Sequence, residues 1–223
     1  MGLKQILRES LARLRTSACL VLQRVLPSAS LSSDDLITPA GPHPLHGPWD
    51  EGWALDFHSY RTPVGWQPTE LGRLTRKYKY RGRIDLADRL ADRIIIVMEQ
   101  HPTLKAIDGI VTVPSSVQRL YDPVCLLGQV LARRLGVPLL TGVLQKTRRT
   151  ERQKDMHTRA QKRANIAGAF VANGDVRGKS LLVLDDLYDS GETLKEVTRV
   201  LKRAGARSVR VLTLTRTRYA HSR

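Results

Sequence analysis

From about residue 84 onward, apolar runs as short as β-strands alternate with segments that have helical spacing. The apolar runs are 109–113, 167–172, 180–186 and 208–216, and the helical segments are 85–100, 122–136 and 192–205. This alternation predicts an α/β fold with a mainly parallel sheet and helices on both of its faces. We therefore expect one core domain over residues 84–223.

The chain before this core divides into three parts. Residues 1–26 predict a basic amphipathic helix, which docks on its own domain or on a partner, or else contacts a membrane surface. Residues 27–48 are rich in Pro, Ser and Gly and predict a linker. Residues 49–83 hold most of the aromatic side chains, and we expect irregular chain that enters a helix near residue 70 and forms a hood on the core. These aromatics either belong to a core or stack on nucleobases.

The composition narrows the class of protein. The 37 Lys and Arg residues against 21 Asp and Glu give a formal net charge of +16, which favours polyanionic partners such as phosphorylated metabolites, nucleic acid or anionic lipid. Cys19 and Cys125 lie outside any CxxC motif, so we expect neither a disulfide framework nor a cysteine zinc site, and a cytoplasmic location. No apolar run approaches the roughly 18 residues of a transmembrane helix.

Four acids are crowded into one short stretch of this basic chain. The sequence LLVLDDLYDSGETL, residues 181–194, contains Asp185, Asp186, Asp189 and Glu192. Carboxylates this close repel one another unless a cation or a set of sugar hydroxyls lies among them. The stretch follows an apolar strand, and open parallel sheets bind ligands beyond the carboxyl ends of their strands.

The residues around this strand end suit a phosphorylated sugar. Residues 189–193, which are Asp189, Ser190, Gly191, Glu192 and Thr193, lead into a helix whose backbone N–H groups and dipole favour an anion. Asp185 and Asp186 precede them and can accept hydrogen bonds from vicinal hydroxyls or hold Mg²⁺ through water. A ribose 5-phosphate carries vicinal hydroxyls a few ångströms from a phosphate, and it therefore matches both parts of this site.

The segment VLDDLYDSGET resembles the phosphoribosyl-pyrophosphate (PRPP) signature of type I phosphoribosyltransferases. Residues 74–83, 111–116 and 147–170 look like the ComF-type branch, which is associated with competence for DNA uptake. Matching positions are Lys79, Tyr80, Gly82, Pro114, Thr150, Gln153, Arg163, Asn165, Gly168 and Phe170. The resemblance implies that Asp185 and Asp186 contact the ribose hydroxyls and that residues 189–193 cradle the 5′-phosphate. It also implies Mg²⁺ with PRPP, or a nucleoside monophosphate, and a nucleobase-like acceptor.

The resemblance implies further roles. Ser115, Ser116 and Arg119 would bind pyrophosphate, although a plain strand-to-helix turn fits them almost as well. Apart from the resemblance, the position of Tyr188 inside the loop makes it a candidate for flanking a base. The basic segment 146–163 resembles the mobile lid that excludes water during transfer, and its alternatives are a solvated loop or a nucleic-acid contact. The lid residues are Lys146, Arg148, Arg149, Arg152 and Gln153.

Three departures from the branch are visible. The four-cysteine zinc element of many ComF-type proteins cannot be built here, and the sequence RLYDP at 119–123 replaces the usual RGFNQ. Asp189 stands where Thr is common. It resembles the carboxylate of purine-salvage phosphoribosyltransferases, which acts as general base; alternatively, Asp189 caps the following helix. Glu192 is unfavourable beside a phosphate unless it points to solvent.

Three functions follow from these patterns. The first is an enzyme that transfers a phosphoribosyl group, and the second is a non-catalytic PRPP or nucleotide sensor that acts in DNA uptake or single-stranded DNA handling, possible partners being competence proteins. The third is a basic nucleic-acid binder, whose affinity would fall steeply with salt.

Overall fold

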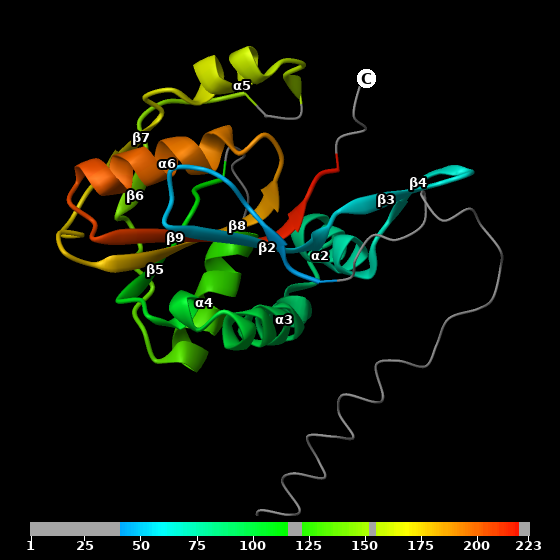
Figure 1. Ribbon diagram of the computed structural model, residues 1–223, viewed down its shortest axis with the longest axis horizontal. Coiled ribbons are helices and arrows are strands. Elements are labelled where there is room, and N and C mark those ends of the chain that lie inside the picture. Colours follow the sequence, from blue (N-terminus) through cyan, green and yellow to red (C-terminus); the bar gives the residue numbers. More distant parts are fainter. Residues whose placement is uncertain (1–40, 116–121, 152–154, 219–223) are drawn as a thin grey trace, which may run out of the picture. The chain divides into compact units, whose positions relative to one another are not determined.

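We analysed a computed structural model, which describes residues 41–115, 122–151 and 155–218 (Figure 1). All described residues belong to one compact unit within residues 38–223. The predicted helix over 1–26 and the linker as far as residue 40 lie outside the described residues. No helix within the described ranges is long and apolar enough to cross a membrane.

A five-stranded sheet forms the centre of this unit. Its order is β1 (His43–Pro44), β2 (Glu51–Phe57), β9 (Ser208–Arg216), β8 (Ser180–Tyr188) and β5 (Gly109–Thr112). The last four strands run parallel, and only the short β1 pairs antiparallel, with β2. The expected mainly parallel sheet is therefore confirmed.

Helices cover both faces of the sheet (Figure 1). Leu182 and Leu184 of β8 pack against a cluster from α2 (Glu70–Tyr80), α3 (Ala87–Gln100) and α4 (Pro123–Leu135). Leu181 and Val183 point to the other face, where they pack with α6 (Glu192–Arg203). The helix α5 (Arg159–Ile166) lies against α6. Because β8 is covered on both faces, its apolar run is continuous rather than alternating.

The helices α2, α4 and α5 begin at a residue whose side chain caps the first turn. Thr69 Oγ1 accepts a hydrogen bond of 2.9 Å from Gly72 N at the start of α2. Asp122 does the same for the first turn of α4. Thr158 and Gln161 form a reciprocal capping box at α5. Each cap satisfies N–H groups that have no partner inside the helix.

Two expected elements differ in the structure. The prediction of irregular chain before residue 70 is wrong over residues 51–57. These residues form β2, a strand of the main sheet, with Ala54 and Leu55 buried on opposite faces. It is followed by a hairpin, β3 (Ser59–Thr62) and β4 (Gly65–Pro68). The strand expected at 167–172 is the short β7 (Phe170–Ala172), which pairs with β6 (Leu144–Lys146) outside the main sheet. The helix near residue 70 is confirmed.

Gly72 allows α2 to approach the end of β2 closely. A Cβ atom at this position would lie 2.0 Å from the backbone oxygen of His58. Gly72→Ala should therefore destabilise the protein by about 1–3 kcal/mol through overpacking, although Ala is favoured over Gly by about 1 kcal/mol at an ordinary helix position. Urea unfolding measures the difference, and an unchanged or raised midpoint would contradict the close approach.

Candidate functional site

The acid pair lies at the carboxyl end of β8, beside charges supplied by other elements. Asp186 N donates a hydrogen bond of 2.8 Å to Asp185 Oδ1. The Asp186 carboxylate forms an ion pair with Lys79, near the end of α2. A carboxylate has about four acceptor positions, so this pair leaves Asp186 capacity for a further donor.

Burial and charge act on the protonation of this group. Burial raises the pKa of Asp185 well above its usual range, the neighbouring Asp186 adds to this, and Lys79 works against it. Burial alone would lower the pKa of Lys79, but the attraction of Asp186 outweighs it and the pKa is raised. Burial lowers the pKa of Lys146 on β6, and the charge of Asp185 opposes this shift. The acid pair therefore lies in the field of two lysines from different elements.

The turn after β8 leads directly into α6. Gly191 is the N-cap residue of α6 and has φ +77° and ψ −3°, the left-handed region that glycine tolerates best. A Cβ atom here would also lie 2.7 Å from ring atoms of Tyr188. Ser190 Oγ lies 3.5 Å from Glu192 N. The first-turn N–H groups of α6 have no partner within the helix, which makes this end suitable for an anion.

Asp189 does not cap α6, so that alternative is wrong. Gly191 is the N-cap, and it has no side chain that could accept a hydrogen bond. The Asp189 carboxylate instead forms an ion pair with Lys162 of α5 and accepts a hydrogen bond of 3.0 Å from Thr217 Oγ1. The role of Asp189 as a general base stays a prediction.

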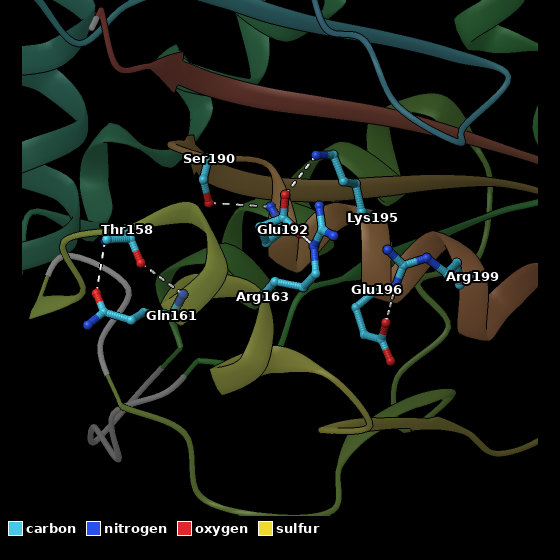
Figure 2. A network of polar contacts seen from close by, with 8 residues as sticks. All are labelled: Thr158, Gln161, Arg163, Ser190, Glu192, Lys195, Glu196 and Arg199. Atoms are coloured by element: carbon cyan, nitrogen blue, oxygen red, sulfur yellow. Dashed lines mark hydrogen bonds and ion pairs between the residues drawn. The ribbon is translucent and has the colours of Figure 1, made fainter.

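Glu192 does not point to solvent, contrary to the condition that the sequence suggested. Its side chain is only 1% exposed and forms ion pairs with Lys195 at 2.8 Å and Arg163 at 3.2 Å. Figure 2 shows Arg163 reaching from α5 to Glu192 at the start of α6. Burial raises the pKa of Glu192, but the hydrogen bonds from Lys195 and Arg163 outweigh it and lower the pKa overall.

Tyr188 and Ser115 are placed by the ends of two strands. The Tyr188 ring packs on Gly191 and lies edge-to-face with Trp49, with a centroid separation of 6.4 Å. The role of Tyr188 beside a base stays a prediction. Ser115 is exposed shortly after β5. Ser116 and Arg119, the other predicted pyrophosphate ligands, lie outside the described residues.

The predicted lid residues occupy different settings. Lys146 belongs to β6 and donates a hydrogen bond of 2.9 Å to Thr150. Arg148 donates to the carbonyl oxygens of Asn165 and Ala167, which end α5. Arg149 is exposed. Arg152 and Gln153 lie outside the described residues, so the lid stays a prediction.

Sequence reasoning missed the cations that face the signature acids. Lys79 and Lys195 were given no role at the site, and Lys162 and Arg163 were expected only as part of the basic segment 146–163, not beside the signature acids. Lys79 and Arg163 match the ComF-type branch. These lysines and this arginine come from α2, α5 and α6. A sequence signal existed in the basic content of 146–163, but no spacing rule brings residue 163 next to residue 192.

The raised pKa of Asp185 predicts that this residue destabilises the fold as the pH rises. When the pKa of a carboxyl is higher in the folded than in the unfolded protein, the free energy of unfolding falls as the pH rises between those two pKa values. The slope is up to about 1.4 kcal/mol per pH unit. Asp185→Asn removes this cost and can still accept from Asp186 N. We expect the variant to gain stability over the unchanged protein from about pH 4 upward, as measured by urea unfolding at pH 4, 6 and 8. A difference that is constant with pH would contradict the assignment.

Comparison with known proteins gives the family. The family described as "Phosphoribosyl transferase domain" matches residues 125–221, a range that contains the site at the end of β8. The "DNA utilization protein YhgH" of Salmonella typhimurium is 31% identical over 154 residues, which cover 66% of this chain and 67% of that protein. The chain belongs to the type I phosphoribosyltransferase family, in its ComF-type branch. "Competence protein F" of Haemophilus influenzae is 24% identical over 163 residues, 69% of this chain and 71% of that protein.

Comparison with solved structures finds phosphoribosyltransferases at low similarity. The purine phosphoribosyltransferase of Pyrococcus horikoshii has a TM-score of 0.38 at 18% identity. The match covers 59% of this chain and 82% of that enzyme. The adenine phosphoribosyltransferase of Saccharomyces cerevisiae has a TM-score of 0.40 at 18% identity. The match covers 70% of this chain and 83% of the yeast enzyme. The family assignment rests on the sequence matches. The predicted fold class and family are confirmed.

Proposed function

We propose that the protein binds Mg²⁺ and PRPP, or a nucleoside monophosphate, and transfers the phosphoribosyl group to or from a nucleobase-like acceptor. The observation that carries this proposal is the order of groups at one strand end. Asp185 and Asp186 lie near the carboxyl end of β8, which ends at Tyr188, and a left-handed Gly191 then turns the chain into the N-terminus of α6. Carboxylates suit the ribose hydroxyls and the helix end suits the 5′-phosphate.

Asp189 is the proposed general base. It lies between the acid pair and the helix end, and in the free protein Lys162 and Thr217 contact its carboxylate. A base near the anomeric carbon takes a proton as the acceptor nitrogen attacks. Transfer through an oxocarbenium-like transition state also needs water to be excluded. We propose that the basic segment 146–163, the predicted lid, has this role.

The donor set at the acid pair fits Mg²⁺ held mainly by its substrate. Mg²⁺ usually keeps several waters and is bound by one or two carboxylates together with substrate phosphates. Asp185 and Asp186 supply such carboxylates, and Lys79 already neutralises part of the charge of Asp186. When bound with pyrophosphate, Mg²⁺ would neutralise the negative charge of this leaving group.

The test of this proposal separates an enzyme from a sensor. The protein is incubated with PRPP, Mg²⁺ and a panel of nucleobases, and pyrophosphate release is followed alongside PRPP binding by calorimetry. Release that depends on one of the bases supports transfer. Tight binding without release supports a non-catalytic PRPP or nucleotide sensor, and absence of both outcomes contradicts the proposal.

A second candidate function is the handling of single-stranded DNA. The β3–β4 hairpin exposes Tyr60 and Trp66, at 37% and 45%, and Arg61 is the cross-strand neighbour of Trp66. An exposed aromatic side chain next to a cation, such as Trp66 beside Arg61, suits stacking on a base of a single strand. The names of the two relatives refer to DNA utilization and competence, which makes DNA and competence proteins candidate partners. DNA affinity that falls steeply with salt and does not depend on PRPP would favour this function.

A further inference from the structure

We propose that α5 is a second phosphate-binding element of the site, and that Lys162 and Arg163 transfer from Asp189 and Glu192 to a phosphate group of the bound ligand. The inference rests on the proposed function, because the ligand is taken to be phosphorylated. It adds two residues outside the signature, and it gives the unusual acids of the loop a partner in the free protein.

The first support is the charge around the loop. Asp189 and Glu192 are carboxylates within or beside the turn that would receive a phosphate dianion, and like charges this close repel. Three cations, Lys162, Arg163 and Lys195, contact these two carboxylates. The group as a whole therefore carries an excess of positive charge, and an anion can bind if the cations are shared with it.

The second support is the burial of Lys162. Its side chain is 11% exposed, and its ammonium group forms the ion pair with Asp189. A buried ion pair is often no more stabilising than apolar residues of similar volume, so its presence is weak evidence for a structural role. Asp189 of this pair directly precedes Ser190 and Gly191 in the sequence, and both of these residues are buried.

The third support is that α5 has other anchors. The capping box of Thr158 and Gln161 starts the helix, and Arg148 donates to the carbonyl oxygens at its end (Figure 2 shows the box). Glu196 of α6 accepts a hydrogen bond of 2.9 Å from Gly168 N, just after α5. Ile166 belongs to the same buried apolar cluster as Leu194 and Val197 of α6. These contacts anchor α5 in addition to the ion pairs of Lys162 and Arg163, so the position of the helix does not depend on those two pairs alone.

The test is a double-variant cycle with ribose 5-phosphate and pyrophosphate as separate ligands. Lys162→Met, Asp189→Asn and the double variant are compared by calorimetry, and thermal unfolding checks that each is folded. We expect Lys162→Met to weaken the binding of at least one of the two ligands about tenfold or more, as for the loss of a charged hydrogen bond. We expect the same loss when Lys162→Met is made in the Asp189→Asn protein. The ligand that is affected identifies which phosphate Lys162 contacts.

The cycle separates ligand binding from simple neutralisation of Asp189. If Lys162 only neutralised Asp189, the double variant would bind both ligands as well as Asp189→Asn alone, and that result would overturn the inference. Arg163→Met should weaken the affinity for the same ligand severalfold. Arg199→Met is the matched control, because Arg199 pairs with Glu196 on α6 away from the loop, and it should change affinity less than twofold. If the unchanged protein binds neither ligand nor PRPP, the proposed function itself is wrong.

Discussion

An Asp185→Asn, Asp186→Asn double variant is expected to lose affinity for PRPP by about 100-fold or more while the protein stays folded. Each ionised carboxylate that accepts from a ribose hydroxyl contributes about 1.5–3 kcal/mol, and the amides that replace them lose the charge. Asn keeps the shape of both side chains and still accepts from Asp186 N at position 185. Calorimetry with Mg²⁺ and PRPP measures the loss, and circular dichroism confirms the fold.

The control for this variant is Asp50→Asn. Asp50 forms an ion pair with Lys202 and accepts from Val209 N, so its loss also breaks a charged contact, but away from the end of β8. Its PRPP affinity should match that of the unchanged protein. The single Asp185→Asn variant should bind PRPP about tenfold more weakly, although it is more stable at neutral pH. A double variant that binds PRPP with unchanged affinity would remove these acids from the ligand site.

Asp189→Asn is expected to lower kcat by about 100-fold and to change PRPP affinity by less than about threefold. General base catalysis contributes about 10²–10⁴-fold, and an amide cannot take the proton. The side chain keeps its hydrogen bond from Thr217 Oγ1, because the amide oxygen still accepts. Steady-state pyrophosphate release with a responsive base gives kcat and KM separately.

Glu196→Gln serves as the matched change for Asp189→Asn. Glu196 is also a largely buried acid with a cationic partner, Arg199, and it lies one turn further along α6. Its kcat should stay within about twofold, because its contacts are to Gly168 N and Arg199 rather than to the loop. A kcat for Asp189→Asn within threefold of the unchanged protein would make the pair with Lys162 the whole role of Asp189.

The core of the fold could be predicted because local signals and the global pattern agree. The apolar run of β8, the capping residue Asp122 and the helical spacing of α3 each indicate the element that forms. The strand β2 was not recognised, because its seven residues combine aromatic, acidic and small side chains. Its membership in the sheet depends on pairing with β9, some 150 residues later in the sequence, which no local signal reports.

The site could be predicted only as far as one continuous segment defines it. The acid pair and the turn at Gly191 are adjacent in sequence, so the strand-to-helix geometry follows from residues 180–193 alone. The partners of these acids could not be predicted. Lys79 and Lys162 reach them from α2 and α5 because both helices pack against the sheet or α6, and such contacts depend on tertiary structure.

The most direct measurement is the titration of the unchanged protein with PRPP, with and without Mg²⁺, in a calorimeter at moderate salt. The account predicts saturable binding of one PRPP per chain that is tighter with Mg²⁺ and is competed by ribose 5-phosphate and by pyrophosphate. No saturable heat at millimolar PRPP, or binding that neither competitor reduces, would contradict the assignment of a phosphoribosyl site at the end of β8.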